Sequence, residues 1–334
     1  MREKLLPRLL HRPCGDPGVI VHVIVEGYEY LFDLPPVSHV ATRLLRRVRA
    51  AFVTHTHVDH FVGMGHFLRV NLTRDEEVLL VGPEGFVSNV NGFLSAFTWN
   101  LGEDYPFRLR VLEVGETTRK EATFSCRNHF VMESLRECPS DGPIVENEVH
   151  RVTACTLDHG IPVLAFRMEE HDHVNINAQA LTEAGLPPGP WLKEIKRAIK
   201  LGMDESTPMD TPAGRRPIGE ITRELVIVTP GRSIGYVVDT AYHEENLERL
   251  IPFLEGVDIL YMETAFPEGE EERALERNHF NAFHAAVIAQ QVRAKRLRPL
   301  HISPKYLGHE EEMVRQMAKH FSGEIQLSRP YRKS

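Results

Sequence analysis

Four side chains of the kind that bind metals stand within six residues of this sequence. His55, His57, Asp59 and His60 directly follow the apolar run 50–54, which predicts a buried strand that ends in a loop. In extended backbone, residues 55, 57 and 59 point to one side, and a turn after Asp59 brings His60 beside it. Imidazole and carboxylate groups bind zinc and related metals. The spacing predicts two ligand pairs, which suits two metal ions about 3.5–4 Å apart.

The alternative is a polar surface loop that is rich in histidine because the whole chain contains 18 histidines. The place of the motif favours chelation over this alternative. An apolar strand precedes the motif, and Gly63 and Gly65 follow it, where the absence of a side chain lets a helix approach closely.

The composition is that of a globular protein without an excess of basic residues. The 334 residues suffice for a large core, and 42% of them are apolar and 26% charged. With a net charge of −8, binding of a polyanion requires a local basic patch. The four cysteines form no C-x-x-C pair and predict free thiols. The sequence shows no signal-like or membrane-spanning apolar run, so we expect a cytoplasmic protein without a membrane partner.

The pattern of apolar residues predicts strands with tight turns first and alternating strands and helices later, which is typical of an α+β layered sandwich. A segment rich in Pro and Gly at 170–220 is expected to leave the main body as an arm. We expect a hairpin at 18–33 around Glu26-Gly27, further strands at 50–54, 78–81, 108–114, 153–157, 163–168, 225–228, 234–238, 257–262 and 297–302, and helices at 38–49, 190–201, 244–255 and 282–294.

Several segments carry a family resemblance. Residues 54–63 resemble the signature loop of the metallo-β-lactamase superfamily, and other segments resemble ribonuclease Z, the family of enzymes that trim the 3′ end of precursor tRNA. The matches come in the order of the family, and they are Gly82–Phe86, Asp158–Pro162, Gly185–Pro190, Leu192–Lys196, Gly231-Arg232, Val238–Thr240, Glu263–Phe266, Asn278-His279 and Leu300–Ser303.

The resemblance implies an αββα four-layer sandwich that forms one domain, 1–334, with the arm 170–220 inserted in it. It implies a metal-dependent phosphodiesterase, a tRNA 3′-processing endoribonuclease whose substrate is precursor tRNA or another RNA. It also implies a homodimer and two divalent metal ions, with zinc favoured and manganese as the other candidate.

The resemblance also implies a role for each site residue. His55, His57 and His159 would hold one metal, and Asp59, His60 and His301 the other. Asp239 would bridge both ions. Metal ions of this kind make a nucleophile from water at neutral pH, and Asp59 would orient that water. His279 would protonate the leaving oxygen, with Glu263 holding its other ring nitrogen.

Two segments depart from the family pattern. Phe32-Asp33 is followed by Leu34-Pro35-Pro36 where the family has Cys-Gly. Asn278-His279-Phe280 stands where the family has Gly-His-Ser. The departures and the acidic charge keep a second interpretation open, a hydrolase of a small ester, lactone or cyclic phosphodiester. A third is a non-catalytic binding or metal-sensing protein, against which the full set of seven ligands argues.

Two places in the sequence could contact phosphate. Lys193, Lys196, Arg197 and Lys200 share one face of the helix predicted at 190–201. This face can bind phosphates, as the resemblance implies, or be the solvated side of an amphipathic helix. Lys305 follows the strand predicted at 297–302 and, with Ser303, could meet a phosphate.

Overall fold

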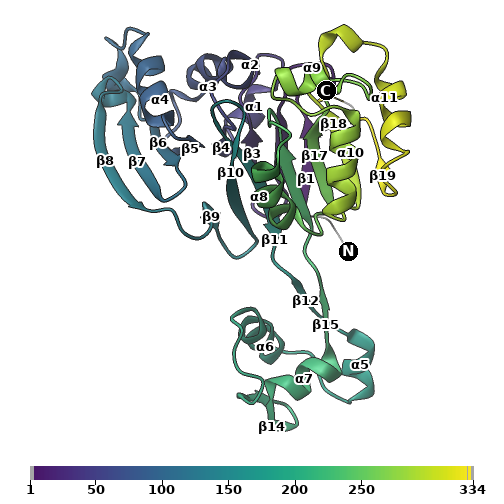
Figure 1. The fold of residues 1–334 in the computed structure, drawn as a ribbon. Coiled ribbons are helices and arrows are strands. Elements are labelled where there is room, and N and C mark those ends of the chain that lie inside the picture. The colour runs from purple at the N-terminus through teal and green to yellow at the C-terminus, as the bar shows by residue number, and fades with distance from the viewer. Residues whose placement is uncertain (1–3, 329, 332–334) are drawn as a thin grey trace. The chain divides into compact units, whose positions relative to one another are not determined.

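The computed structural model describes residues 4–328 and 330–331, and Figure 1 shows the fold. The chain divides into two compact units. The first, which we call the body, comprises Met1–Asn147, Arg151–Met168 and Ser233–Ser334. The second, the arm unit, comprises Glu148–His150 and Glu169–Arg232. The limits 170 and 220 that the sequence predicts for an arm fall within this second unit, and its status as an insertion in a single domain stays a prediction.

Two sheets form the centre of the body. The first has eight strands in the order of the chain: β1 (Leu5–Leu9), β2 (Val19–Val23), β3 (Tyr28–Phe32), β4 (Val48–Phe52), β5 (Val78–Pro83), β6 (Arg108–Val114), β7 (Thr118–Ser125) and β8 (Met132–Pro139). The second has the order β19-β18-β17-β16-β11-β10-β9. Its strands are β9 (Val145–Glu146), β10 (His150–Asp158), β11 (Pro162–Glu170), β16 (Ser233–Val237), β17 (Ile259–Glu263), β18 (Arg296–Leu300) and β19 (Glu324–Ile325).

The two sheets pack face to face through aromatic side chains. Phe32 on β3 contacts Phe166 on β11 and Tyr236 on β16, with ring centroids 5.9 and 5.7 Å apart. Phe52 on β4 contacts Phe166 at 5.5 Å. These side chains are fully buried. Burial of such large apolar surfaces is the main stabilising contribution to a two-sheet core.

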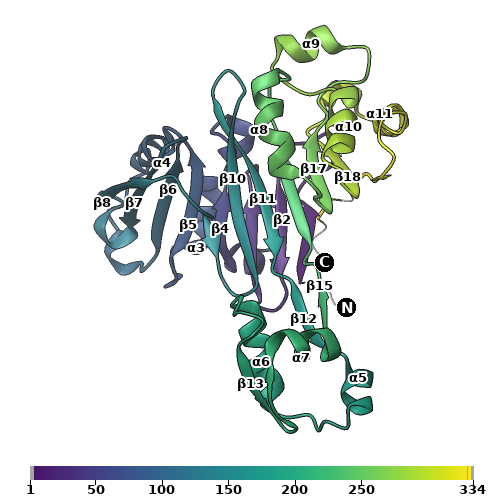
Figure 2. The same ribbon diagram turned by 60° about the horizontal axis from the view of Figure 1, so that its bottom comes forward.

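Helices cover the outer face of each sheet (Figures 1 and 2). One apolar cluster joins the first sheet to α1 (Thr42–Leu45), α2 (Val58–Phe61), α3 (Met64–Asn71) and α4 (Phe86–Ser95). Another joins the second sheet to α8 (Glu244–Leu254), α9 (Glu271–Glu276), α10 (Ala282–Gln291) and α11 (Glu310–Met317). Short 3₁₀ turns lie at Gly102–Asp104, Cys126–Asn128 and Pro304–Tyr306. The body is therefore an αββα four-layer sandwich, as predicted.

The arm unit has a small core of its own. Its elements are β12 (His173–Ile176), α5 (Ala178–Glu183), α6 (Trp191–Lys200), β13 (Pro208–Thr211), β14 (Gly214–Pro217), α7 (Ile218–Leu225) and β15 (Val226–Thr229). Ile195, Ile221 and Leu225 are fully buried in the cluster at its centre. Strands β12 and β15 pair antiparallel, so that Ile176 lies opposite Val226. No described helix in either unit is both long and apolar enough to cross a membrane.

One predicted helix is mostly wrong. The spacing of Leu44, Leu45 and Val48 predicts a helix at 38–49, but α1 is a single turn and Val48 begins β4. Strand β4 pairs in parallel with β3 and β5 on its two sides. Pairing and burial in the centre of a sheet outweigh a helical spacing over three apolar residues.

Candidate metal centre

The candidate ligands converge at one edge of the body because each follows the carboxyl end of a strand. His55 follows β4, and His159 follows β10. Asp239 follows β16, Glu263 is the last residue of β17, and His301 follows β18. These last three strands are parallel to one another. The carboxyl ends of parallel strands meet at the same edge of a sheet, where polar ligand sites commonly form. The loop from His55 to His60 lies at this edge, and α2 begins within it.

The side chains gather in three groups of possible ligands. The first is His55, His57, His159 and Asp239, and the second is Asp59, His60 and His301. In the third, Asp239 and His301 meet Glu263 and His279. Within each group the ligand atoms lie no more than 4.8 Å apart. All nine site residues named from the sequence therefore come together in the body.

Asp239 lies between the first two groups. Its Oδ2 is 3.5 Å from His55 Nε2, 3.6 Å from His159 Nε2 and 3.3 Å from His60 Nε2. Its Oδ1 is 2.6 Å from His301 Nδ1. Oδ2 therefore lies near both groups and Oδ1 lies near His301 of the second group, so this one carboxylate contacts the candidate ligands of two cations.

The polar atoms at the centre fit cations that the protein would hold there. His55 Nε2, His60 Nε2, His301 Nδ1 and Asp239 Oδ1 are buried, and among the described residues none of them makes a hydrogen bond of acceptable geometry, although the last two lie 2.6 Å apart. A buried polar atom without a partner costs about 1–3 kcal/mol, so four at one point are unfavourable unless something satisfies them. Neutral imidazole nitrogens and a carboxylate are the donor set of a divalent transition metal. The residues present therefore fit divalent metal ions.

The backbone is strained at the same place. Asp33, Asp239, Asn278 and His301 have φ angles of 60°, 49°, 56° and 53°, in the left-handed region that non-glycine residues seldom adopt. Such strain costs on the order of 1–3 kcal/mol per residue and gathers at functional sites. Asp239 and His301 contact each other in the cluster, and the Asn278 carbonyl contacts His159. The Asp33 carboxylate contacts His60.

Sequence reasoning did not assign a role to Asp33, which is fully buried at the end of β3. Its carboxylate lies 3.0 Å from His60 Nδ1 and accepts hydrogen bonds from Thr54 N at 2.7 Å and Tyr236 Oη at 2.8 Å. Holding the Nδ1 proton of His60 leaves Nε2 as the free ligand atom. The sequence shows only that Asp33 follows an apolar strand, and that position alone does not reveal these contacts.

Burial and charge set the protonation of the centre. Burial opposes the negative charge on Asp239, but His301 and His60 beside it hold its pKa well below the ordinary value. Burial likewise opposes ionisation of Asp59, and hydrogen bonds with His301 and His60 lower its pKa. Burial, with His60 nearby, lowers the pKa of His55 to about 2. Two ionised carboxylates therefore face neutral His55. Burial opposes the charge on His60 and His301, but the Asp239 carboxylate outweighs burial and raises the pKa of both. Binding of a cation at these two histidines would release their protons.

His279 and Glu263 form a close pair at the edge of the centre. Glu263 is fully buried, and its Oε2 lies 2.6 Å from His279 Nδ1 while Oε1 accepts a hydrogen bond from Thr240 N. Burial opposes the charge on His279, but the Glu263 carboxylate outweighs it and raises the pKa above 6.5. His159 is held in a similar way, with Nδ1 2.7 Å from the Asn278 carbonyl, so its Nε2 faces Asp239.

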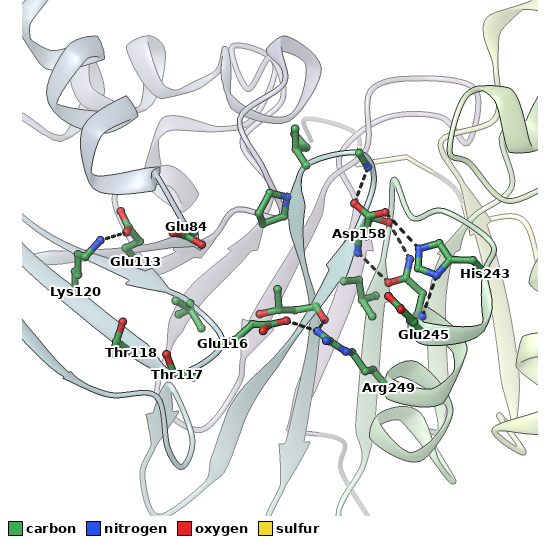
Figure 3. Close-up of a pocket in the computed structure, with 18 residues that line it drawn as sticks. Glu84, Glu113, Glu116, Thr117, Thr118, Lys120, Asp158, His243, Glu245 and Arg249 are labelled. Carbon is green, nitrogen blue, oxygen red and sulfur yellow. Dashed lines mark hydrogen bonds and ion pairs between the residues drawn. The ribbon is translucent and has the colours of Figure 1, made fainter.

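An acidic hollow of about 500 Å³ lies beside His159, whose neighbours Asp158 and Gly160 line it (Figure 3). Five carboxylates reach it, on Glu84, Glu113, Glu116, Asp158 and Glu245. Lys120, Arg249 and His243 pair with three of them. Glu84 and Glu245 have no cationic partner among the described residues, so this side of the centre is unfavourable for phosphate groups.

The two departures from the family pattern have structural consequences. Phe280 is fully buried in the core around α10 and contacts Tyr242, so its ring belongs to the core. The backbone of Leu34-Pro35 packs directly against Gly63, which follows α2. Gly63 N donates a hydrogen bond to Leu34 O, and a Cβ at Gly63 would lie 1.9 Å from Pro35 O. This close approach is the kind that the glycine predicted.

The fold and the cluster together define a protein of the metallo-β-lactamase fold that carries a set of candidate metal ligands. The chain superposes on the metallo-β-lactamase fold protein YhfI from Bacillus subtilis with a TM-score of 0.58 and 13% identity, covering 98% of both chains. It superposes on human tRNase Z, short form, with a TM-score of 0.55 and 15% identity, covering 97% of this chain and 96% of that one. At these identities the likeness shows the fold alone.

The sequence relatives identify the family. The chain is 31% identical over 255 residues to the ribonuclease Z of Deinococcus radiodurans, which covers 76% of this chain and 75% of that protein. It is 29% identical over 302 residues to the ribonuclease Z of Anoxybacillus flavithermus, covering 88% and 83%. No family model matches the sequence. The chain belongs to the ribonuclease Z family, as the resemblance of its motifs predicts.

Proposed function

We propose that the protein is a metal-dependent endoribonuclease that cleaves precursor tRNA at the 3′ side of the mature sequence. The observation that carries the proposal is the convergence of buried, unpartnered nitrogen and oxygen atoms on Asp239, in a chain whose relatives are ribonucleases Z. In this proposal His55, His57 and His159 would hold one divalent ion, Asp59, His60 and His301 would hold the other, and Asp239 would serve both.

Zinc is the ion that we propose, with manganese as the second candidate. Histidine-rich sets with one or two carboxylates suit zinc, whereas more carboxylate-rich sets suit manganese. When bound, such ions supply a nucleophile from water at neutral pH and stabilise charge on a phosphoryl oxygen.

The chain's own residues orient the reaction. The Asp59 side chain is 39% exposed, and its lowered pKa keeps it ionised, so it can orient an attacking water or accept its proton. His279 is held at Nδ1 by Glu263, which leaves Nε2 to give a proton to the leaving oxygen. Its raised pKa keeps more of the donor form at neutral pH.

We further propose that the arm unit binds the RNA and that the protein acts as a homodimer in the cytoplasm. The basic face of α6, with Lys193, Lys196, Arg197 and Lys200, supports phosphate binding. The four cysteines are free thiols, which suits a reducing compartment such as the cytoplasm.

Light scattering on the purified protein tests the proposed homodimer, which a measured mass of one chain would exclude.

Incubation of the purified protein with a 3′-extended precursor tRNA and zinc or manganese tests the proposed activity. We expect the wild type to cut near the end of the acceptor stem and the H57A variant to lose the activity. Equal cutting by both proteins would identify a contaminant. A wild type that binds metal but cuts no RNA would refute the proposed substrate.

A further inference from the structure

Arg273 lies near the candidate proton donor, on the side of the centre away from the acidic hollow. Asp158 ends β10 and His301 follows β18, and these strands lie on opposite sides of β16, which leads to Asp239. The hollow adjoins the β10 side. On the β18 side, Arg273 from α9 and Lys305 after His301 reach the surface around Glu270.

Aromatic contacts connect Arg273 to His279. The Arg273 guanidinium lies over the Phe266 ring, 5.1 Å from its centroid. The Phe266 ring in turn meets the His279 ring, with centroids 6.2 Å apart and planes inclined at 66°. Phe266 is only 6% exposed and packs in the core of the second sheet, so its ring has a fixed position. The guanidinium is therefore one aromatic ring away from the candidate proton donor.

Hydrogen bonds fix the guanidinium but leave part of it free. Arg273 Nη1 donates to Glu270 Oε2 at 3.1 Å, and the same oxygen accepts from Tyr306 Oη at 2.6 Å. No described residue accepts a hydrogen bond from Arg273 Nε or Nη2, and the side chain is 43% exposed. A stacked, pre-oriented guanidinium with free N–H groups is well suited to bind a phosphate.

Two cations share one carboxylate at this place. Lys305 Nζ lies 3.6 Å from Glu270 Oε1, and Arg273 pairs with Oε2 of the same carboxylate. Helix α9 also carries Glu271, Glu272 and Glu276, so the net charge of this surface does not by itself attract an anion. The free N–H groups of Arg273 are therefore the feature that favours a phosphate here.

We propose that Arg273 binds a backbone phosphate of the RNA next to the scissile one and so positions the substrate at His279. The inference rests on the proposed function and specifies which side of the metal centre the RNA occupies. Arg273 is a substrate-binding residue in this proposal and takes no part in the chemical step.

The test compares R273Q with R315Q. Glutamine at 273 keeps much of the aliphatic contact with Phe266 and removes the charge. Arg315 is a matched control because it is also an exposed helical arginine paired with a glutamate three residues before it, Glu312. Each variant is assayed on 3′-extended precursor tRNA and on bis(p-nitrophenyl) phosphate, a small phosphodiester without neighbouring phosphates.

We expect R273Q to raise KM for the RNA about tenfold or more, as for loss of a hydrogen bond to a charged group. The slope of log(kcat/KM) against log salt should fall by about 0.7–0.9, the effect of one phosphate contact. Hydrolysis of the small phosphodiester and all constants of R315Q should stay unchanged. A purely structural role for Arg273 would lower both activities and leave the salt slope unchanged.

An unchanged KM and salt slope for R273Q would overturn the proposal, as would an equal loss on both substrates. A wild type that hydrolyses the small phosphodiester but no RNA would instead refute the proposed function. In that case the salt dependence of tRNA binding, measured by fluorescence anisotropy, tests whether Arg273 contacts a phosphate. An equal slope for R273Q and wild type in that measurement would exclude the phosphate contact.

Discussion

At the scale of single residues, the candidate ligands in 55–60 could be named from the residue types that metals require, and His159, Asp239 and His301 from the family resemblance. The residues that support them could not be named, because their role depends on contacts across the fold. Asp33 lies 203 positions before Tyr236, which donates a hydrogen bond to it. Nothing local to Phe32-Asp33 shows that contact.

Asp33 provides the first prediction. D33N keeps the residue's size, and asparagine tolerates the φ of 60°. The amide removes the negative charge and one acceptor facing His60, Thr54 and Tyr236. We expect metal affinity to fall about 10- to 100-fold and the free energy of unfolding to fall by about 1–3 kcal/mol. Calorimetric metal titration and urea unfolding measure the two effects, and wild-type affinity in D33N would contradict the role of Asp33.

His284 provides the second prediction, on the dependence of stability on pH. Its side chain is 4% exposed and stacks on Tyr242 with ring centroids 3.8 Å apart. Burial lowers its pKa from 6.5 to about 4. The folded state therefore favours neutral His284, so its contribution is complete above pH 6.5 and is lost as the pH falls towards about 4. The loss amounts to about 3 kcal/mol.

The variant H284Q isolates this effect because glutamine can also close the capping box with Asn281 at the start of α10. Urea unfolding with EDTA at pH 7.5 and 4.5 removes the contribution of bound metal from both proteins. We expect the wild type to lose more stability than H284Q over this range. Equal losses would show that His284 takes up a proton as readily in the folded state as in the unfolded one.

At the scale of elements, apolar and β-branched runs predicted most of the central strands correctly. The hairpin β7-β8 was not predicted, because its stability comes from pairs across the strands. Lys120 lies opposite Glu137, and Glu121 lies opposite Arg136. Such polar strands have no apolar alternation, and their partners become known only with the register. The helix at 38–49 was wrong for the related reason that pairing on both sides makes Val48–Phe52 a strand.

The junction of α2 and α3 gives the third prediction. A Cβ at Gly63 would overlap the carbonyl oxygens of Pro35 and Leu34, whereas a Cβ at Gly65 has no atom nearer than 3.6 Å. G63A should therefore displace α2, which contains His60, and lower stability by about 3 kcal/mol or more. G65A, in α3, should stay within about 1 kcal/mol of wild type. Thermal unfolding and metal content measure both variants, and a fully stable, metal-loaded G63A would contradict the close packing.

At the scale of the whole molecule, the αββα architecture was predicted correctly because ordered family motifs specify it. The two-unit division needed the structure, since composition marks an unusual segment without its limits. Pro and Gly are frequent at 185–220, but the arm unit extends over Glu169–Arg232. The sequence did not show these limits, because β12 and β15 near its ends have the same pattern as other short strands.

The fourth prediction separates the proposed RNA substrate from a small one. Ile176 and Val226 face each other in β12 and β15, so an Asn-Gly turn can replace residues 177–225 and close a hairpin. We expect this variant to hydrolyse bis(p-nitrophenyl) phosphate like the wild type and to lose at least about tenfold in kcat/KM on precursor tRNA, since the basic face of α6 is removed. Undiminished cleavage of precursor tRNA would exclude a role of the arm unit in binding RNA.

The central claim is that side chains from His55 to His301 converge to hold two cations. Metal content per chain, measured by mass spectrometry after dialysis against trace zinc or manganese, tests it directly. We predict about two ions for the wild type and fewer for D239N, in which asparagine tolerates the φ of 49° but cannot bridge with two charged oxygens. A folded wild type that binds no divalent metal, or a D239N variant as fully loaded as the wild type, would contradict the account.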